Sequence, residues 1–327
     1  MAVREADTPS TRDTEGSGPG SEEVVSVDEV NLASRHSVKK ASEGTFSVPK
    51  TFAEHSEGYR RWPAVDYEAG SVHMGFGICE LDPGGSIAWH VHSFEESVYV
   101  LEGEVVCETS DGAFVLRPGN YGLMPVGAPH RWRNAGSVAV RWADMLAPRP
   151  DASFGRSTFI VPPRTVEASP ISIEVRDPRT RSFGHIELEH MDVSKQTQDM
   201  LAVSASMRTA LLVYSGITVK MMVDSDLGSH LSTMFMVQYE PGGLAGVHDH
   251  PFEEAYLILE DEVDAVFDDQ EYRLRPGDVA FAGVGCPHAF SYPGTGRVRW
   301  LETQAPQPPA RHSYRFARDW DYLRDRL

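Results

Sequence analysis

Short apolar segments with alternating or continuous hydrophobic positions recur through most of the chain, and turn-forming residues separate them. In the first half, this pattern predicts β-strands at residues 72–81, 87–92, 96–102, 105–109, 113–116 and 138–145. In the second half, it predicts a strand pair within residues 209–223, broken at Gly216, and strands at residues 233–239, 246–250, 254–260, 263–267, 270–274, 279–281 and 298–304. Many short strands separated by Gly, Pro, Asp and Asn turns indicate an all-β fold of the barrel or sandwich type.

The segments outside this pattern divide the chain into five parts. Residues 1–44 are rich in Ser, Thr, Glu, Gly and Asp, and they cannot bury enough apolar surface to offset their ordering entropy, which predicts a disordered tail. Residues 45–150 and 205–310 each hold one set of strands, and residues 151–204 between them form a linker with lead-in strands. Residues 311–327 predict a C-terminal amphipathic helix, because Phe316, Trp320 and Leu323 fall on one helical face.

The two halves of the chain repeat one another at a constant offset of 158 residues. Pro83-Gly84-Gly85 recurs as Pro241-Gly242-Gly243, and Arg117-Pro118-Gly119 recurs as Arg275-Pro276-Gly277. The register holds without a gap over about 60 residues, which is typical of a duplicated structural unit. The sequence therefore predicts two barrels of the same design.

Each copy contains two histidines one residue apart, a glutamate four residues after the second histidine, and a later histidine that follows a proline. Side chains alternate between the two faces of a strand, so the paired histidines point the same way, and a turn brings the glutamate back beside them. Three imidazoles and one carboxylate suit a divalent transition metal ion. The predicted ligands are His90, His92, Glu96 and His130 in the first copy, and His248, His250, Glu254 and His288 in the second.

The spacing of these ligands resembles that of a known superfamily. The first copy reads Gly85-x4-His90-x-His92-x3-Glu96-x6-Gly103, followed by Gly119-x5-Pro125-x-Gly127-x2-His130-x3-Asn134. This resembles the two signature motifs of the cupins, and the repeat makes the chain similar to a bicupin, which implies two tandem jelly-roll β-barrels with a metal site in each. The second copy departs from the motif where Asp261 replaces Gly103, Gly283 replaces Pro125 and Tyr292 replaces Asn134, and none of these is a ligand.

Further resemblances point to different groups of bicupin. The whole-chain layout resembles the (S)-ureidoglycine aminohydrolase group, through the Pro241-Gly242-Gly243 turn, the strand at residues 255–259 and the Gly277-Asp278 turn. That group has a different ligand set, with a glutamate first and a glutamine late. The three-histidine, one-glutamate pattern instead resembles quercetin-dioxygenase-type bicupins and oxalate decarboxylase. The acidic lid tetrad expected of the decarboxylase is not recognisable, so the decarboxylase ranks lower.

The ligand set favours a catalytic metal ion. Four protein ligands on a six-coordinate ion leave two positions for a substrate, water or O2, whereas a closed structural zinc site more often uses cysteines. We expect manganese or iron, with nickel, copper and zinc also possible, and up to two ions per chain. A metal-dependent dioxygenase acting on a small polar enol or phenol is favoured over a manganese-dependent hydrolase. A non-catalytic bicupin that binds a small ligand is the third alternative.

Strand alternation suggests which other side chains lie near the ions. Tyr256, Gln238 and Glu302 are expected to face the interior of the second barrel, where they could orient a substrate or move a proton. Their counterparts in the first copy are Val98, Glu80 and Asp144. The second interior is the more polar, which predicts that the chemistry takes place in the C-terminal barrel. Glu95 and Glu253 precede the ligand glutamates and face the opposite way, as solvated or interface charges.

Composition narrows the class of protein further. The chain has 327 residues and a net charge of −18, without a basic stripe, so nucleic acid is not an expected partner. Three widely spaced cysteines argue against a disulfide scaffold. There is neither an apolar leader nor a run long enough to span a membrane, which favours a cytoplasmic protein that acts on a small-molecule substrate. Because exposed sheet edges are commonly buried by subunit pairing, we expect a homo-oligomer.

Overall fold

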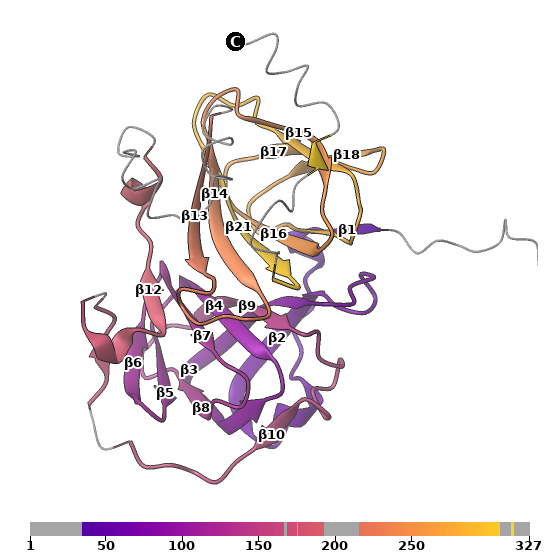
Figure 1. The fold of residues 1–327 in the computed structure, drawn as a ribbon. Coiled ribbons are helices and arrows are strands. Elements are labelled where there is room, and N and C mark those ends of the chain that lie inside the picture. Colours follow the sequence, from indigo (N-terminus) through magenta and orange to yellow (C-terminus); the bar gives the residue numbers. More distant parts are fainter. Residues whose placement is uncertain (1–34, 167–168, 175, 193–215, 308–314, 317–327) are drawn as a thin grey trace, which may run out of the picture. The chain divides into compact units, whose positions relative to one another are not determined.

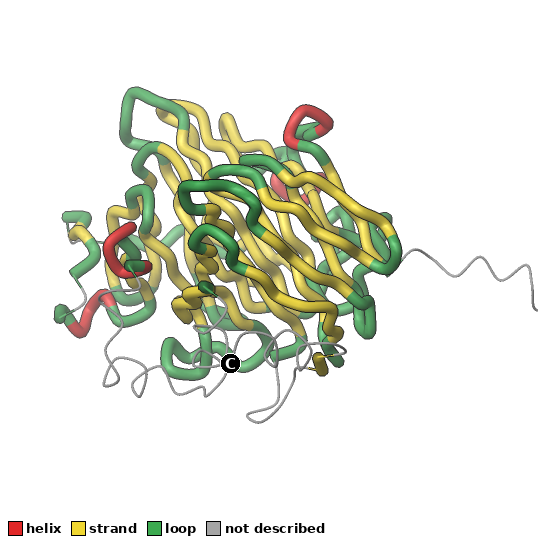
Figure 2. Tube along the Cα trace, turned by 90° about the horizontal axis from the view of Figure 1, so that it is seen from above, coloured by secondary structure: helices red, strands yellow, loops and turns green. Residues whose placement is uncertain are grey.

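Strands make up nearly all the regular structure of this protein. The computed structural model describes residues 35–166, 169–174, 176–192, 216–307 and 315–316. Within these residues the helices are short 3-10 turns, namely η2 (Ala41–Glu43), η3 (Lys50–Phe52), η4 (Pro178–Thr180) and η5 (Leu188–Met191). Figure 2 shows the strands side by side, with loops mostly at their ends. The all-β prediction is therefore confirmed.

The N-terminal barrel is one curled sheet built around a long bent strand. Its strands follow the order β11-β6-β5-β8-β3-β9-β4-β7-β12, and β2 and β10 also pair with β3. The bounds are β2 (Ser56–Val65), β3 (Gly75–His92), β4 (Glu95–Glu102), β5 (Val105–Thr109), β6 (Gly112–Leu116), β7 (Asn120–Met124), β8 (His130–Arg133), β9 (Val140–Ala147), β10 (Thr158–Ile160), β11 (Ile171–Ser172) and β12 (Phe183–His185). These strands run from indigo to pink in Figure 1.

The C-terminal barrel consists of two sheets. One has the order β1-β19-β16-β21-β14-β13 and the other has the order β18-β17-β20-β15-β22. The bounds are β1 (His36–Lys39), β13 (Ile217–Val223), β14 (Thr233–Tyr239), β15 (Leu244–Asp249), β16 (Glu253–Glu260), β17 (Val263–Phe267), β18 (Gln270–Leu274), β19 (Val279–Ala282), β20 (His288–Ser291), β21 (Val298–Ala305) and β22 (Arg315–Phe316). At the offset of 158 residues, β4, β5, β6, β8 and β9 coincide with β16, β17, β18, β20 and β21, so the duplication extends to the structure.

Each barrel receives a strand from a segment outside its own repeat. β1 lies ahead of the N-terminal barrel in sequence, yet it pairs antiparallel with β19, where His36 is opposite Ala282. β12, which comes from the linker, pairs in the same way with β7, the counterpart of β19. The predicted tail therefore ends earlier than residue 44, because residues 36–39 gain backbone hydrogen bonds from β19; residues 1–34 lie outside the described part.

Other differences from the sequence prediction have local causes. The hydrophobic pattern does not predict β7 and β8, because each is a short strand bounded by the Gly and Pro turns that also carry the motif. The predicted helix over 311–327 is wrong where it can be compared, since Arg315–Phe316 forms β22 beside His248 and Asp249 of β15. The rest of that segment, the end of the predicted linker from residue 193 and the predicted strand ahead of Gly216 lie outside the described residues.

Three buried clusters fill the structure, and one of them lies between the barrels. The N-terminal barrel is filled around Trp132 and Trp142, and the C-terminal barrel around Tyr256 and Trp300. The third cluster joins residues of both barrels, including Phe76, Met145, Met234, Met236, Phe281 and Leu301. Alternation divides β14 between two of these clusters, because Phe235, Val237 and Tyr239 face the barrel interior whereas Met234 and Met236 face the other barrel. Both faces of this sheet are therefore buried.

Two buried glutamates join the barrels reciprocally. The Glu253 carboxylate accepts hydrogen bonds from the Ser71 hydroxyl (2.7 Å) and from the backbone N–H groups of Val72 (2.7 Å), His73 (2.9 Å) and Met74 (3.2 Å).

Its counterpart, Glu95, accepts from the Ser229 hydroxyl (2.7 Å) and from the N–H groups of His230 (2.8 Å) and Leu231 (3.0 Å) in the C-terminal barrel. Glu95 is 3% exposed and Glu253 is 2% exposed. The sequence prediction of an interface charge therefore fits better than that of a solvated one.

Within the residues that the structure describes, neither long helices nor disulfides contribute to the fold. Among the described residues, no helix has the length and hydrophobicity needed to cross a membrane. Cys79, Cys107 and Cys286, which are the three cysteines of the chain, are all buried and form no disulfide. The barrels are therefore held by packing and hydrogen bonds without a covalent cross-link.

We predict that replacing Glu253 by Ala lowers the free energy of unfolding by about 3 kcal/mol, because the buried Ser71 hydroxyl and three successive backbone N–H groups lose this acceptor. Denaturant unfolding measures this change. The exposed Glu104, which pairs with Arg117, is the control, and E104A should change stability by no more than about 0.5 kcal/mol. A loss below about 1 kcal/mol in E253A would show that the carboxylate is not a major joint between the barrels.

Candidate metal centres

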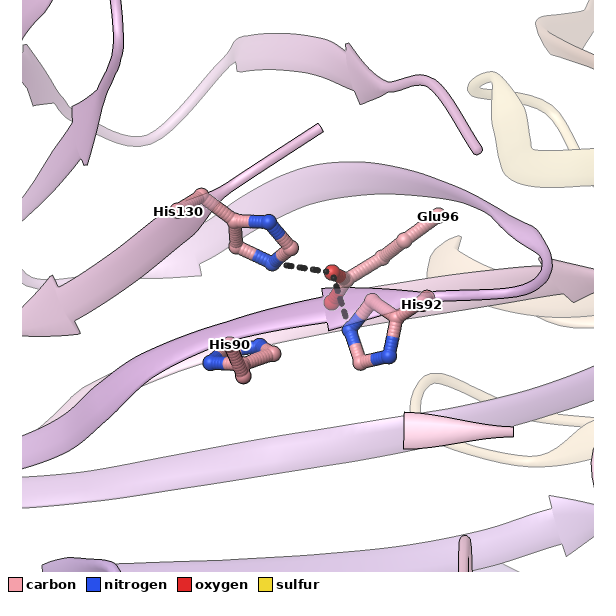
Figure 3. Close-up of side chains that lie close together, drawn as sticks. All are labelled: His90, His92, Glu96 and His130. Carbon is pink, nitrogen blue, oxygen red and sulfur yellow. Dashed lines mark hydrogen bonds and ion pairs between the residues drawn. The ribbon is translucent and has the colours of Figure 1, made fainter. Parts of the chain in front are cut away.

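The N-terminal centre brings four predicted ligands to one point inside the barrel. His90 and His92 lie on β3, Glu96 lies at the start of β4, and His130 opens β8. All four side chains are buried, and one donor atom from each lies within 4.8 Å of all the others. Figure 3 shows the three imidazoles and the carboxylate turned toward one another.

Hydrogen bonds on the outer side of the imidazoles set which nitrogen faces the centre. His90 Nδ1 lies 2.7 Å from the Ala88 carbonyl oxygen, and His130 Nδ1 lies 2.9 Å from that of Ala128. A carbonyl oxygen only accepts, so each Nδ1 carries the hydrogen, and in a neutral ring Nε2 then presents a lone pair. Second partners of this kind orient histidine ligands in metal sites.

The resulting donor arrangement fits a cation. His130 Nε2 lies 3.1 Å from Glu96 Oε2, and His92 Nε2 lies 3.5 Å from the same oxygen. A neutral imidazole and a carboxylate both present lone pairs at these distances, and a bound cation would stabilise both. Burial, together with the adjoining imidazoles of His130 and His92, lowers the pKa of His90 and keeps that ring neutral.

The C-terminal centre repeats this plan with one change. The Nδ1 hydrogens of His248 and His288 point to the carbonyl oxygens of Gly246 (2.6 Å) and Cys286 (3.0 Å), so that their Nε2 atoms also face inward. His250 completes a group of three imidazoles whose donor atoms lie within 4.8 Å of one another. Burial and the adjoining imidazoles lower the pKa of His248.

Glu254 is held at the side of this group by other polar side chains. Its carboxylate accepts hydrogen bonds from the Tyr256 hydroxyl (2.6 Å) and from Gln304 Nε2 (2.6 Å). It remains 3.1 Å from His250 Nε2 and 3.2 Å from His288 Nε2. The centre can therefore present three imidazoles to an ion. A small rotation of the Glu254 side chain would add its carboxylate to the ligands or remove it.

The two centres differ most in the partner of a nearby buried acid, which is Asp144 on β9 in the N-terminal barrel and Glu302 on β21 in the C-terminal barrel. In the N-terminal barrel, the buried Arg61 guanidinium donates two hydrogen bonds of 2.6 Å to Asp144. Burial opposes the charge on Arg61, but Asp144 raises the pKa of Arg61, so the guanidinium stays charged. In the C-terminal barrel, Val219 stands at the position of Arg61, and Glu302 stands at that of Asp144.

Within the described part of the chain, no cation forms an ion pair with Glu302. Its Oε2 atom accepts a hydrogen bond of 2.9 Å from Trp300 Nε1. Burial and the neighbouring charge of Glu254 raise the pKa of Glu302, which favours the protonated form of this carboxyl group.

The space beside the ligands also differs between the barrels. The cavity at the C-terminal centre has a volume of about 40 Å³, and the one at the N-terminal centre has a volume of about 10 Å³. A buried water needs about 10 to 15 Å³ on this measure, so the first holds about three waters and the second holds one at most. In the N-terminal barrel, Phe52, Phe154 and Trp132 line this smaller cavity.

Of the other three predicted site residues, two line the C-terminal cavity and one does not. Tyr256 and Glu302 line the C-terminal cavity, as alternation predicts. Gln238 does not line it, because it lies on the opposite face of β14, where its Nε2 donates to the Met191 carbonyl (3.2 Å) and to Glu240 (2.9 Å).

The expectation that Gln238 faces inward is wrong. Side chains alternate along β14, and Val237 and Tyr239 are the ones that point into the barrel. Glu80, the counterpart of Gln238, likewise faces outward, toward Arg60 and Arg141.

Three residues near the centres are missed by the sequence prediction. Gln304 follows Glu302 by two on β21, so alternation is a sufficient signal for it. Arg61 and Thr158 come from outside the repeated motif. Arg61 lies on β2, and the Thr158 hydroxyl on β10 lies 2.8 Å from His92 Nδ1. Only the folded barrel brings them to the site.

Comparison with known proteins agrees with this duplicated architecture. Residues 77–146 and 235–303 each match the cupin domain family. Protein SchB of Streptomyces halstedii is 38% identical over 87 residues, which are 25% of this chain and 63% of SchB. The chain thus spans less than two thirds of the length of this curated relative.

Solved structures share the fold at low sequence identity. Salicylate 1,2-dioxygenase from Pseudoaminobacter salicylatoxidans has a TM-score of 0.60 and 15% identity, over 85% of this chain and 84% of that chain. Oxalate decarboxylase from Lactobacillus farciminis has a TM-score of 0.57 and 14% identity, over 89% of this chain and 93% of that chain. With a cupin match in each half and a group of metal-ligating side chains inside each barrel, this chain is a bicupin.

Proposed function

We propose that this bicupin is a metal-dependent oxygenase that acts on a small phenol or enol in its C-terminal barrel. The observation that supports the choice of barrel is the cavity beside His248 and His288, because Tyr256 and Glu302 also line it. It combines a candidate metal centre, a buried acid and space for about three waters, which the oxygen atoms of a substrate could displace. The corresponding space in the N-terminal barrel is smaller and its acid is neutralised by Arg61.

The proposed ion is iron(II) or manganese(II), held by His248, His250 and His288 with Glu254 as a further ligand. Imidazole and carboxylate donors suit both ions. When bound, such an ion supplies Lewis-acid chemistry and, for iron or manganese, one-electron redox chemistry. The N-terminal ligands would hold a second ion whose main effect is to stabilise the folded barrel.

The residues around the cavity support a role in proton transfer and substrate orientation. The Glu302 carboxyl is buried at the cavity wall and its raised pKa favours the protonated form, so it can donate a proton to a substrate oxygen and take it back. The Tyr256 hydroxyl lies 3.1 Å from His288 Nε2, close enough to contact any molecule bound at the centre.

The composition of the cavity wall favours a planar substrate of low charge. Most of the lining is apolar or aromatic, including Phe235, Tyr239, Phe290 and Trp300. Among the described residues, no lysine or arginine lines the cavity, so no protein cation is placed to bind a dicarboxylate. This supports a phenol or enol, as the name of the salicylate dioxygenase suggests, over a small diacid, as the name of the oxalate decarboxylase suggests.

The proposal predicts oxygen consumption that depends on a first-row metal ion. Protein loaded separately with iron(II), manganese(II) or zinc(II) would be assayed in an oxygen electrode against a panel of phenols and enols, and elemental analysis would give the ions bound per chain. We expect up to two ions per chain, and oxygen uptake with iron or manganese but not with zinc. Turnover of a substrate in strictly anaerobic solution would contradict the oxygenase proposal and favour a hydrolase or decarboxylase.

The assignment to the C-terminal barrel predicts that matched ligand variants differ. H250A should lose the C-terminal ion and all measurable turnover while the fold persists. H92A should keep its turnover but melt at a lower temperature, because it loses an ion that binds only the folded state. Turnover and melting temperature would be measured for both variants with their bound metal quantified. An inactive but well-folded H92A beside an active H250A would reverse the assignment.

Replacing Glu302 and its counterpart Asp144 by the corresponding amides should affect kcat and stability differently. E302Q should lower kcat by about 100-fold, since it removes a group that transfers a proton, with little effect on stability. D144N should leave kcat within about threefold of the wild type. It should lower the free energy of unfolding by about 3 kcal/mol, because it removes the charge that pairs with buried Arg61. Equal effects of the two variants on kcat would argue against a special role for Glu302.

A further inference from the structure

We propose a third metal site, separate from the two cupin centres, in which His36, Asp268 and Cys286 bind a zinc-like divalent ion. Donor atoms of the three side chains lie within 4.8 Å of one another. Imidazole, carboxylate and thiolate together are donors that zinc accepts, and the cupin centres contain no thiol. This site is independent of the reaction proposed for the C-terminal barrel.

The distances between the donors match a tetrahedral ion. His36 Nδ1 lies 3.1 Å from Asp268 Oδ2, and Cys286 Sγ lies 3.8 Å from the same oxygen. Zinc bonds of ordinary length at tetrahedral angles place nitrogen and oxygen donors about 3.4 Å apart, and sulfur and oxygen donors about 3.6 Å apart. Both pairs that include Asp268 are therefore within a few tenths of an ångström of tetrahedral spacing. The donor atoms of His36 and Cys286 lie within 4.8 Å of each other, and a water could take the fourth position.

The hydrogen-bond network turns the correct nitrogen of His36 toward the site. The Tyr272 hydroxyl donates its only hydrogen to Gln270 Oε1 at 2.7 Å. The same hydroxyl lies 2.9 Å from His36 Nε2, so it must accept a hydrogen from that nitrogen. In the neutral ring, Nδ1 then presents its lone pair toward Asp268. In the cupin centres a hydrogen bond also fixes the tautomer, but there Nδ1 carries the hydrogen and Nε2 faces the site.

The surrounding backbone holds the three donors in place. Asp268 occupies the turn between β17 and β18 with a positive φ of 51°, a conformation that Asp tolerates better than most residues. Its N–H donates to the Pro287 carbonyl oxygen at 2.8 Å, which fixes the turn beside Cys286. Arg35 binds the Oδ1 atom of Asp268 and leaves Oδ2 directed toward His36 and Cys286. His36 itself is buried against Phe267, with ring centroids 5.7 Å apart.

An ion at this site would have a structural effect. His36 lies on β1, ahead of the N-terminal barrel in sequence, whereas Asp268 and Cys286 belong to the C-terminal barrel. The ion would cross-link β1 to that barrel and stabilise the folded state. Binding would release the Cys286 thiol proton to solvent, with formation of a metal–sulfur bond. The competing arrangement is a protonated His36 paired with Asp268, without metal.

Cobalt(II) titration of the metal-free full-length protein distinguishes these arrangements, because cobalt bound to thiolate gives a near-ultraviolet charge-transfer band. The cupin ligands are histidine and glutamate, so the band reports on a cysteine site alone. We expect the band in the wild type, its loss in C286A and H36A, and its retention in the matched control C107A. Elemental analysis should then find one zinc ion per chain fewer in C286A and H36A than in C107A.

Two results would overturn the third site. One is the appearance of cobalt absorption from histidine sites in the wild type without a thiolate band. The other is a thiolate band that survives in C286A. Circular dichroism of each variant would accompany the titration, and the wild-type titration decides the question even if a variant fails to fold.

Discussion

The hydrogen bonds from the outer nitrogens of the ligand histidines are the constraint on which both cupin centres depend. In four of the six histidines, Nδ1 points to the carbonyl oxygen two residues earlier in the chain, as in His90 with Ala88 and His248 with Gly246. A strand interior would normally use that carbonyl in its ladder, and here β3 and β15 each have a register irregularity just before the ligands. At Ala88 and Gly246 the irregularity leaves the carbonyl available to the histidine, whereas Ala128 and Cys286 precede the strands that begin at His130 and His288. In each case the carbonyl fixes the tautomer of the histidine, which directs Nε2 inward.

Duplication gave both barrels this ligand geometry, and the surrounding residues then made the two centres different. A buried arginine on β2 pairs with the acid of the N-terminal barrel, and aromatic side chains line the small cavity beside it. In the C-terminal barrel a valine replaces the arginine, a longer acid replaces the aspartate, and a tyrosine and a glutamine surround the ligand glutamate. The same four ligands therefore lie in a closed, charge-balanced site in one barrel and beside an acid-lined cavity in the other. The reciprocal contacts of Glu95 and Glu253, each next to a ligand glutamate, hold the two barrels together at these centres.

Features that depend on local periodicity can be predicted from the sequence. The offset of 158 residues predicts the duplication, and strand alternation combined with turn residues is enough to bring His90, His92 and Glu96 together. Features that depend on packing between distant segments are beyond the reach of such patterns. Nothing local indicates that β1 crosses to the C-terminal barrel or that Arg61 reaches Asp144. The wrong placement of Gln238 has a related cause, because only its strand partners reveal that the barrel interior lies on the side of Val237.

The central claim is that substrate meets metal in the C-terminal barrel. The most direct measurement is a crystal structure of the iron-loaded protein with a bound phenol such as catechol, with anomalous scattering at the iron edge to locate the ions. The account predicts catechol next to an ion held by His248, His250 and His288, with an oxygen within hydrogen-bond reach of Glu302. Catechol bound instead beside His90, His92 and His130, with the C-terminal cavity filled only by water, would contradict it.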